Sequence, residues 1–300
     1  MSKRNLALIG ATIVSIIYGV TFTIAKDVMP KYIDAYGFIL LRAGGSMVLF
    51  WLIWLVMPKE KIAITDFPRI IAAAFFGVAF NMLTFFKGLS LTSPISAAVI
   101  MVSTPMIVLV LSAIIIKERM KKRMVIGIVL GLIGTASLIL YGKSIGDTSQ
   151  SGLGNFLVLV NAISYGFYLI IVKKLMNTYN AFTFVKWIYL FGFIMVLPFG
   201  WNQFADVDWT IVPTDIYWKI GFVVIISTFL TYLLNLLSMK ELKPTTVAVF
   251  IYLQPVFATI FAISLGKDEL TIVKIVSAIL IFIGVFLVTQ KPPNSQWGNK

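Results

Sequence analysis

The sequence predicts an all-α integral membrane protein with ten transmembrane helices, arranged as two inverted five-helix repeats around a central cavity. Three observations lead to this fold class: the composition of the chain, the lengths of its apolar segments and a match between its two halves. Hydrophobic residues make up 59% of the 300 residues and charged residues only 12%. Soluble domains carry roughly 25% charged residues, so this chain lacks the polar surface that it would need in water.

Ten apolar segments are long enough to cross a bilayer, which takes about 17–25 residues per helix. They lie at residues 6–25, 35–57, 69–86, 95–116, 124–141, 153–172, 182–200, 216–238, 245–265 and 272–289. We expect the first to be a retained helix, because it is longer than the apolar region of a signal peptide and has no evident small-residue cleavage site. The pattern defines one boundary poorly, the stretch from Pro198 to Pro213.

The distribution of the +13 net charge predicts how the chain is oriented. With the N-terminus inside, the two tails and the even-numbered loops hold sixteen basic residues and four acids, a net charge of +12, whereas the odd-numbered loops carry −1. Basic residues concentrate in the short cytoplasmic loops of membrane proteins. Both termini are therefore expected in the cytoplasm, and the positive charge requires no nucleic-acid partner.

The two halves of the chain match each other in sequence. At an offset of 150 residues Pro105 meets Pro255 and Gly134 meets Gly284, and at an offset of 147 Tyr18 meets Tyr165. Five helices per copy is an odd number, so the copies cross the membrane in opposite directions, as in many secondary transporters with a midplane substrate site. The predicted repeats are residues 1–145 and 146–300, within a single membrane domain. Chance similarity between apolar segments is the alternative explanation.

Two groups of residues resemble the signatures of a known family. Tyr18-Gly19-Val20-Thr21-Phe22 through Lys26 is similar to the W/Y-G-x-x-F-x-x-x-K signature of EamA-type members of the drug/metabolite transporter superfamily, and Arg42 stands where that family has an arginine in its second helix. The family's proline, glutamate and double-glycine pattern is matched by Pro105, Glu118, Gly127 and Gly134, and again by Pro255, Asp268, Glu269 and Gly284, with Ser277 in place of the first glycine.

This resemblance covers nearly the whole chain. It implies a ten-helix bundle whose central cavity is lined mainly by helices 1, 3, 4, 6, 8 and 9. It does not imply a particular solute, because the family exports amino acids, other metabolites and drugs.

Polar side chains at membrane depth mark the expected cavity, because hydrocarbon cannot satisfy their hydrogen-bonding groups. Asn161, Tyr165 and Tyr168 share one helix face through their i, i+4, i+7 spacing, and Thr228, Tyr232 and Asn235 repeat it. Two such faces suit a wet, aromatic-walled cavity for a small amphipathic or planar solute. Hydrogen bonding between helices is the alternative role for each residue alone. The predicted substrate-binding residues are Tyr18, Thr21, Arg42, Asn81, Ser103, Asn161, Tyr165, Tyr168, Tyr232, Asn235, Tyr252 and Gln254, with Thr104 at the same depth.

Pro105 and Pro255 lie about eleven residues into their segments, near mid-membrane. A proline inside a helix frees the carbonyl one turn earlier and kinks the helix. The equivalent positions of the two prolines predict a pair of hinges flanking the cavity. The alternative is a pair of tolerated membrane prolines without a hinge role.

Arg42 lies about eight residues inside the outer end of the second segment, too deep to remain without a partner or water. Two roles are open: it attracts a carboxylate or phosphate of the solute, or it is a structural clamp to Asp27, Asp34 or helix-end carbonyls. Lys186 is expected to extend its amine to the cytoplasmic interface. Glu118 is expected to form a local ion pair with its basic neighbours.

Missing residue types limit the mechanism. No Asp, Glu or His lies near the middle of any segment, and such a group is the usual titrating site of a proton-coupled transporter. Facilitated diffusion or exchange is therefore favoured, and the lack of a Walker loop argues against ATP as the energy source. Without Cys or His, the chain lacks thiolate metal sites and the commonest general base, so we predict no enzymatic activity, no cofactor and no metal.

Together these features predict a secondary transporter that works by alternating access. It would act as an exporter, facilitator or exchanger of a small metabolite, such as an amino acid or a drug-like amphipathic solute. A nucleotide-sugar or organic-phosphate exchanger of the same superfamily and a non-transporting scaffold or receptor are the alternatives. The predicted partners are the solute and the lipid bilayer, with no nucleic acid. The predicted protein is a functional monomer in the plasma membrane, the inner membrane of a bacterium.

Overall fold

The computed structural model describes residues 3–57, 60–116, 122–141, 149–241, 250 and 253–289, and these residues form helices and their connections without a β-strand among them. Seven helical segments are long and apolar enough to cross a membrane: Asn5–Val28, Ala35–Trp54, Ile64–Leu91, Lys122–Tyr141, Ser151–Met176, Phe182–Ala205 and Thr214–Asn235. Three shorter apolar helical segments, the first of them interrupted by a turn, lie at Pro94–Val108, Gln254–Ser264 and Ile272–Leu287. The all-α class predicted from the sequence is confirmed.

The first half of the chain contains two uninterrupted membrane-length helices, a segmented one, a broken pair and a further long helix. They are α1 (Lys3–Val28), α2 (Ala35–Trp54), η1 (Ile64–Asp66), α3 (Phe67–Ala74), the π-helical η2 (Phe75–Ala79), α4 (Phe80–Leu91), α5 (Pro94–Met101), α6 (Thr104–Ile116) and α7 (Lys122–Tyr141).

The second half begins with two long helices and continues with a third segment that again contains a π-helical stretch. Its elements are α8 (Ser151–Thr178), α9 (Ala181–Ala205), α10 (Thr214–Gly221), the π-helical η3 (Phe222–Leu230), α11 (Thr231–Glu241), α13 (Gln254–Ser264) and α14 (Ile272–Thr289).

Local side-chain contacts explain where several helices begin. The Ser93 hydroxyl accepts the Ser96 N–H, and Pro94 occupies the first turn of α5, where its missing N–H costs nothing. The Asn180 side chain caps α9 in the same way by accepting from Phe182 N. The start of α2 is capped from a distant element, because Gln203 Oε1 accepts the backbone N–H groups at residues 36 and 37.

Several predicted boundaries differ from the structure. The third predicted segment, 69–86, corresponds to Ile64–Leu91, and the sixth, 153–172, continues to Thr178. Two further differences involve prolines. The seventh segment does not end at residue 200, since α9 passes through Pro198 and continues to Ala205. A membrane helix tolerates such a proline because neighbouring groups satisfy the freed carbonyl. The predicted segment 95–116 is not one helix either: α5 ends at Met101 and α6 begins at Thr104. The turn at residues 102 and 103 precedes Pro105, which cannot donate the N–H that would continue α5.

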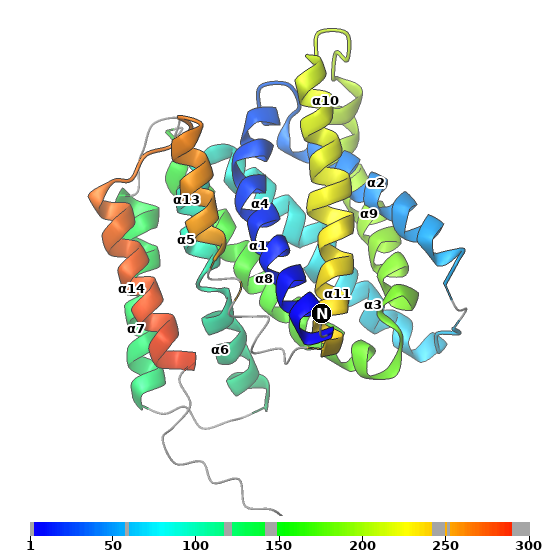
Figure 1. Ribbon diagram of the computed structural model, residues 1–300, viewed down its shortest axis with the longest axis horizontal. Coiled ribbons are helices and arrows are strands. Elements are labelled where there is room, and N and C mark those ends of the chain that lie inside the picture. Colours follow the sequence, from blue (N-terminus) through cyan, green and yellow to red (C-terminus); the bar gives the residue numbers. More distant parts are fainter. Residues whose placement is uncertain are drawn as a thin grey trace, which may run out of the picture.

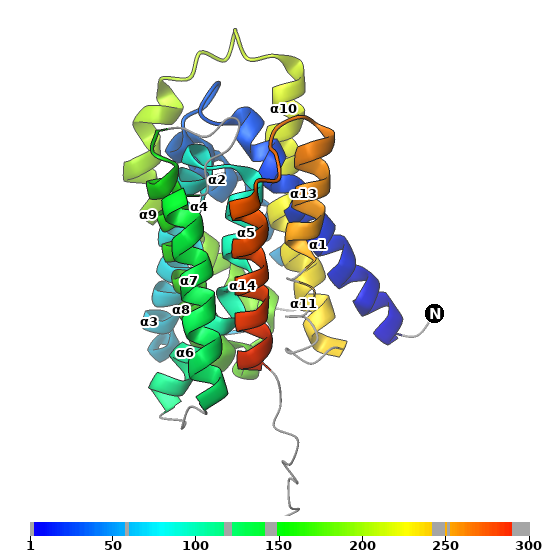
Figure 2. The same ribbon diagram turned by 90° about the vertical axis from the view of Figure 1, so that its left-hand side faces the viewer.

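The helices pack side by side in pairs. In Figures 1 and 2, α7 and α14 stand together at one edge of the bundle, and α2 runs along α9 at a distance from them. Between these pairs, α1 packs against α11 and α13, while α8 packs against α4 and α6. The middle of the molecule therefore lies between α1 with α11 on one side and α4 with α8 on the other.

The contact between α7 and α14 is made through small residues. A Cβ added to Gly284 would lie 2.5 Å from the Gly127 carbonyl oxygen, and one added to Gly134 would lie 2.8 Å from the Ser277 carbonyl oxygen. The two backbones approach this closely because glycine has no side chain to separate them. Gly127, Gly134 and Gly284, which carry part of the family resemblance, are therefore packing residues of this helix pair.

Candidate functional site

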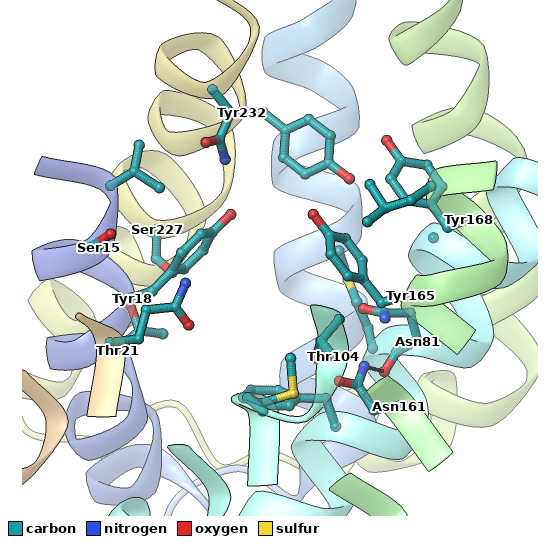
Figure 3. A pocket seen from close by; sticks show the side chains of 18 of the residues that line it. Ser15, Tyr18, Thr21, Asn81, Thr104, Asn161, Tyr165, Tyr168, Ser227 and Tyr232 are labelled. Carbon is teal, nitrogen blue, oxygen red and sulfur yellow. Dashed lines mark hydrogen bonds between the residues drawn. The ribbon is translucent and has the colours of Figure 1, made fainter. Parts of the chain in front are cut away.

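A cavity of about 300 Å³ lies in the middle of the bundle (Figure 3). Its walls come from the segments that correspond to helices 1, 3, 4, 6, 8 and 9 of the predicted ten, with further side chains from α2 and α9. Ten of the twelve predicted binding residues line it: Tyr18, Thr21, Arg42, Asn81, Asn161, Tyr165, Tyr168, Tyr232, Asn235 and Gln254. The structure brings these residues together, and their role in binding a solute stays a prediction.

Tyrosines form opposite walls of the cavity. In Figure 3, Tyr18 on α1 and Tyr165 on α8 point toward each other from the two sides, and Tyr232 on α11 lies between them at one end. The rings of Tyr165 and Tyr168 stack, with centroids 5.7 Å apart. The Tyr232 ring is held edge-on against Tyr189, with centroids 5.3 Å apart. Aromatic walls of this kind favour a solute with a flat or apolar body.

Hydrogen bonds fix several polar side chains of the cavity wall. Asn161 Nδ2 on α8 donates to the Asn81 backbone oxygen over 2.8 Å. The Thr21 hydroxyl donates to the Ile17 carbonyl at 2.6 Å and is hydrogen bonded to the Ser227 hydroxyl at 2.8 Å, which ties α1 to η3. These contacts use part of the hydrogen-bonding capacity of each group. The second lone pairs and amide oxygens remain as acceptors for a solute.

Arg42 reaches the cavity from α2. Its Nε donates to the Thr228 hydroxyl over 2.5 Å, and its guanidinium carbon lies 4.6 Å from the centre of the Phe86 ring. The predicted clamp to Asp27 is wrong, because Asp27 is paired with two lysines instead. No described carboxylate forms an ion pair with Arg42.

Lys186 does not extend to the membrane interface as predicted. Its side chain is buried, and its amine lies 3.2 Å from the centre of the Trp54 ring, 4.8 Å from that of Trp51 and 5.5 Å from that of Trp187. A cation over indole faces is attracted by the ring quadrupole, which offers an alternative to hydration. These tryptophans lie on two different helices, so the spacing of residues along the sequence could not predict that they surround the Lys186 amine.

The remaining predicted residues lie outside the cavity wall or outside the described part of the chain. Ser103 is buried at the turn after α5, where its hydroxyl donates to the Ile100 carbonyl over 2.7 Å. Tyr252 and Glu118 fall outside the described residues. Pro105 and Pro255 each occupy the first turn of a helix, α6 and α13. Pro105 therefore follows the turn between α5 and α6 and does not kink a continuous helix. Their hinge role stays a prediction.

The π-helical segment η3 changes which residues face the cavity. The i, i+4, i+7 pattern placed Thr228 on the wall with Tyr232, but Thr228 is fully buried and its hydroxyl donates to the Val223 carbonyl over 2.8 Å. Ser227 lines the cavity in its place. A π turn holds more residues than an α turn, so it rotates the preceding residues relative to α-helical spacing. Ser227 was therefore missed, as was Ser15, although Ser15 lies one α-helical turn before Tyr18.

The cavity wall runs from the middle of the bundle toward the end at which α1 begins. Ala11 and Val14 near the start of α1, Val172 and Met176 near the end of α8, and Phe184 near the start of α9 all contribute to it. The lining therefore leans to one end of the molecule, the end where the N-terminus lies in Figure 1.

Charged side chains hold the opposite end together. Asp27 at the end of α1 pairs with Lys267 over 2.6 Å and with Lys219 over 2.9 Å, which joins α1 to α10 and to the connection after α13. We refer to these three residues as the ion-pair triad. Beside it, the Asp268–Lys274 pair is buried, with a 2.5 Å contact, and Asp268 accepts the Ile95 N–H at the start of α5.

Known proteins resemble this chain over most of its length. The model of the EamA-like transporter family matches two segments, residues 5–140 and 152–290. The uncharacterized transporter YyaM of Bacillus subtilis is 26% identical over 277 residues, which cover 90% of this chain and 89% of the relative. An uncharacterized transporter of Archaeoglobus fulgidus is 25% identical over 275 residues, covering 91% of this chain and 95% of the relative.

A solved crystal structure has a similar fold. It shares 17% sequence identity with this protein, covers 96% of this chain and 98% of its own, and superposes with a TM-score of 0.61. The family match, the names of the relatives and the apolar helices agree with the resemblance that the sequence motifs indicated. The chain belongs to the EamA-like transporter family and is a multi-pass membrane transporter.

Proposed function

We propose that this protein is a secondary transporter that moves a small amphipathic metabolite, such as an amino acid or a drug-like solute, by alternating access. The observation that carries the proposal is the central cavity, whose polar and aromatic walls come from both halves of the chain. Tyr18 and Tyr165, which match each other in sequence, face each other across it. A site between two repeats near mid-membrane is the arrangement that alternating access uses.

The proposed architecture is ten helices in two inverted repeats, residues 1–145 and 146–300. The family model matches once within each of these ranges. The π-helical segments supply independent support, because η2 begins at Phe75 and η3 at Phe222. Their separation of 147 residues is the offset that also relates Tyr18 to Tyr165.

The contact of α7 with α14 supports the same architecture. Gly134 approaches Ser277, and Gly284 approaches Gly127. The 150-residue offset between the halves relates Gly134 to Gly284 and position 127 to position 277, so it converts the first contact into the second. Such reciprocity is what a two-fold relation between two copies produces at their mutual interface. Gly134 and Gly284 would thus occupy equivalent positions in the two repeats, and each would contact the other repeat.

For the orientation and assembly we propose a plasma-membrane monomer with both termini in the cytoplasm. The +12 and −1 charges of the two sets of loops support the orientation. The cavity is formed within one chain, so transport does not require a second copy. In this orientation the cavity leans toward the cytoplasm and the ion-pair triad closes the external side.

For the energetics we propose facilitated diffusion or exchange without proton coupling. No Asp, Glu or Lys is among the described residues that line the cavity, and the chain has no histidine. The alternative exchanger of nucleotide sugars or organic phosphates is less well supported. Such solutes carry two or more negative charges, and Arg42 is the single cation in the described cavity wall.

Transport by the full chain in proteoliposomes tests the proposal. A thermal-shift panel of amino acids, nucleotides, organic phosphates and lipophilic cations first identifies solutes that bind the purified protein. We expect a bound solute to cross down its own gradient and to exchange against internal solute, while an imposed pH gradient drives no accumulation.

Two results would contradict the proposal. A solute that binds but does not cross the membrane under any gradient indicates a receptor. Accumulation that collapses with a protonophore indicates proton coupling through a group other than a central acid or histidine. Empty liposomes and heat-denatured protein are the controls for leak.

A further inference from the structure

Resting on the proposed transport function, and narrowing its solute class from amino acids to acids without an ammonium group, we infer that the solute is a small organic monoanion and that Arg42 binds its carboxylate. The inference follows from one observation in the cavity. The Arg42 guanidinium reaches the wall of a largely apolar chamber, and the partly buried Asp27 and the buried Asp268 pair with lysines and not with Arg42. The solute thus completes an interaction that the described protein leaves open.

Among the described residues, one hydrogen bond uses a donor of Arg42. A guanidinium has five N–H donors, and one of them, on Nε, binds the Thr228 hydroxyl. The Phe86 ring covers one face of the guanidinium without using an N–H group. Thr228 also donates its own proton to the Val223 carbonyl, so it is fixed as an acceptor that orients Arg42.

Neither acid predicted as a clamp pairs with Arg42: Asp34 is exposed at the start of α2, and Asp27 is engaged elsewhere. The buried Asp268 is engaged as well. Asp27 contacts Lys219 and Lys267 with its two carboxylate oxygens. Asp268 contacts Lys274 and the start of α5. Because arginine stays protonated in proteins, the Arg42 charge persists in the cavity and requires an anion or water.

A carboxylate is the group whose hydrogen-bonding geometry best matches the guanidinium of Arg42. It accepts two parallel N–H bonds from the terminal nitrogens of a guanidinium, and such charge-assisted pairs are roughly twice as strong as neutral ones. The cost of burying an unpaired cation falls when the anion enters. The gain therefore appears only when the solute is bound.

The rest of the wall argues for one negative charge and an apolar body. The described lining carries no second cation for a dianion and no acid for an ammonium group. It offers hydroxyls and amides, among them Asn81 and Gln254, and many apolar side chains such as Phe22 and Met82. Thr104 adds a buried hydroxyl that has no hydrogen-bond partner among the described residues.

Charge-selective labelling of a cavity cysteine tests the inference without knowledge of the natural solute. The chain has no cysteine, so Thr104→Cys and Ser15→Cys each place a single thiol in the cavity wall. Each purified full-length variant is reacted with a sulfonate-bearing and with a trimethylammonium-bearing methanethiosulfonate. The ratio of the two rates is then divided by the ratio for Ser149→Cys, an exposed reference.

We expect the anionic reagent to be favoured about tenfold or more, since one unpaired charge in a site of intermediate dielectric changes local ion concentrations by that order. Adding Arg42→Gln should remove the preference. The ratio isolates the field at the thiol, because a change in thiol ionisation alters both rates equally. Equal rates for the two reagents at both cavity positions, or a preference that survives Arg42→Gln, would overturn the inference.

A matched series of binding probes supplies the second test. The probes are 3-phenylpropionate, 3-phenylpropionamide, phenethylammonium and phenyl phosphate, measured by thermal shift and calorimetry on the same protein. We expect the carboxylate to bind about 10- to 100-fold more tightly than the amide, and Arg42→Gln to equalise the two. Arg42→Lys should keep part of the preference. Arg69→Gln, at a half-exposed pair with Asp66, is the control and should change neither.

The two proposals fail separately. If the protein prefers the carboxylate probe but shows no flux in proteoliposomes, the transport function is contradicted and the anion site is supported. Flux of an amine or amide that exceeds flux of the carboxylate keeps transport and removes the anion site. Failure of every probe to bind, together with equal labelling rates, overturns the anion site as well.

Discussion

Tyr18 and Tyr165 are the residues on which the proposed site depends most directly. They come from α1 and α8 and face each other across the cavity. Tyr18→Ala and Tyr165→Ala should each weaken solute binding about 5- to 150-fold, because each removes an aromatic wall and a hydroxyl worth about 1–3 kcal/mol. Binding of a solute from the thermal-shift panel, measured by calorimetry, checks both.

The control for this pair is Tyr141→Ala, at the exposed end of α7. It removes a ring of the same size from a place outside the cavity, so affinity should not change. Normal binding by both cavity variants, with loss of binding in variants of α7 or α14, would place the site elsewhere in the bundle.

Asn161→Ala belongs to the same scale and separates binding from packing. Its amide holds the Asn81 carbonyl over 2.8 Å while facing the cavity. We expect weaker solute binding and a modest loss of thermal stability, since one hydrogen bond contributes about 0.6 kcal/mol on average between membrane helices. Unchanged affinity with a lowered melting temperature would assign Asn161 to packing alone.

At this scale much of the cavity wall was predictable and two features were not. For polar residues at regular α-helical spacing, such as Asn161 and Tyr165, the periodicity predicts which helix face they share. The prediction for Thr228 was wrong because Thr228 lies in the π-helical segment η3, where α-helical spacing does not apply. The hydropathy pattern does not distinguish a π-helix from an α-helix. The prediction for Lys186 was wrong because two of its three tryptophan partners, Trp51 and Trp54, are on another helix, and local spacing does not encode contacts between helices.

At the scale of elements, the pairing of α7 with α14 depends on glycine. Gly284→Ala should destabilise the protein, because its Cβ would lie 2.5 Å from the Gly127 carbonyl oxygen and the two backbones would have to separate. Overpacking of this kind typically costs about 1–3 kcal/mol. The melting temperature of the variant in detergent, compared with that of the parent, measures the effect.

Gly221→Ala is the matched control for this substitution. Gly221 is also helical, but no heavy atom lies within 4 Å of the added Cβ. Alanine should be neutral or slightly stabilising there, since it lowers the backbone entropy of the unfolded chain. Equal melting temperatures for the two variants would show that α7 and α14 tolerate a wider separation.

Most of these helices were predicted from the sequence, but the places where they are interrupted or continue past a proline were not. Apolar length alone marks α1, α2 and α14 within three residues of their observed limits. It cannot separate α5 from α6, because both are apolar and the break consists of a two-residue turn before Pro105. It also cannot show that α9 continues past Pro198, because a proline permits either outcome and neighbouring helices decide which occurs.

At the scale of the whole molecule, the charge distribution predicts which end faces the cytoplasm. Single cysteines at Asn5, Lys121 and Asn299 should react with membrane-impermeant reagents from the cytoplasmic side only. Cysteines at Ser149 and Ala205 should react only from outside, because short loops with excess lysine and arginine remain inside. Labelling of intact cells and of inverted vesicles reads out the two sides.

A cysteine at Lys121 is the decisive position, since it lies within the basic stretch from Lys117 to Arg123. Labelling from outside at this position would remove the proposed orientation. Labelling of Asn5 and Asn299 from opposite sides of the membrane would instead show an odd number of membrane spans, so the two failures are distinguishable.

The paired π-helical segments have a consequence for the history of this fold. A π turn contains one residue more than the α turn that it replaces, and such turns account for well under 1% of residues in proteins. Two of them begin at Phe75 and Phe222, at matched places in the proposed repeats. In the proposed repeat architecture, a single insertion in an ancestral gene of half the present length, made before that gene was duplicated, would explain both with one event. The extra residue would then be older than the two-fold molecule, and half-length descendants of that ancestor should carry it too.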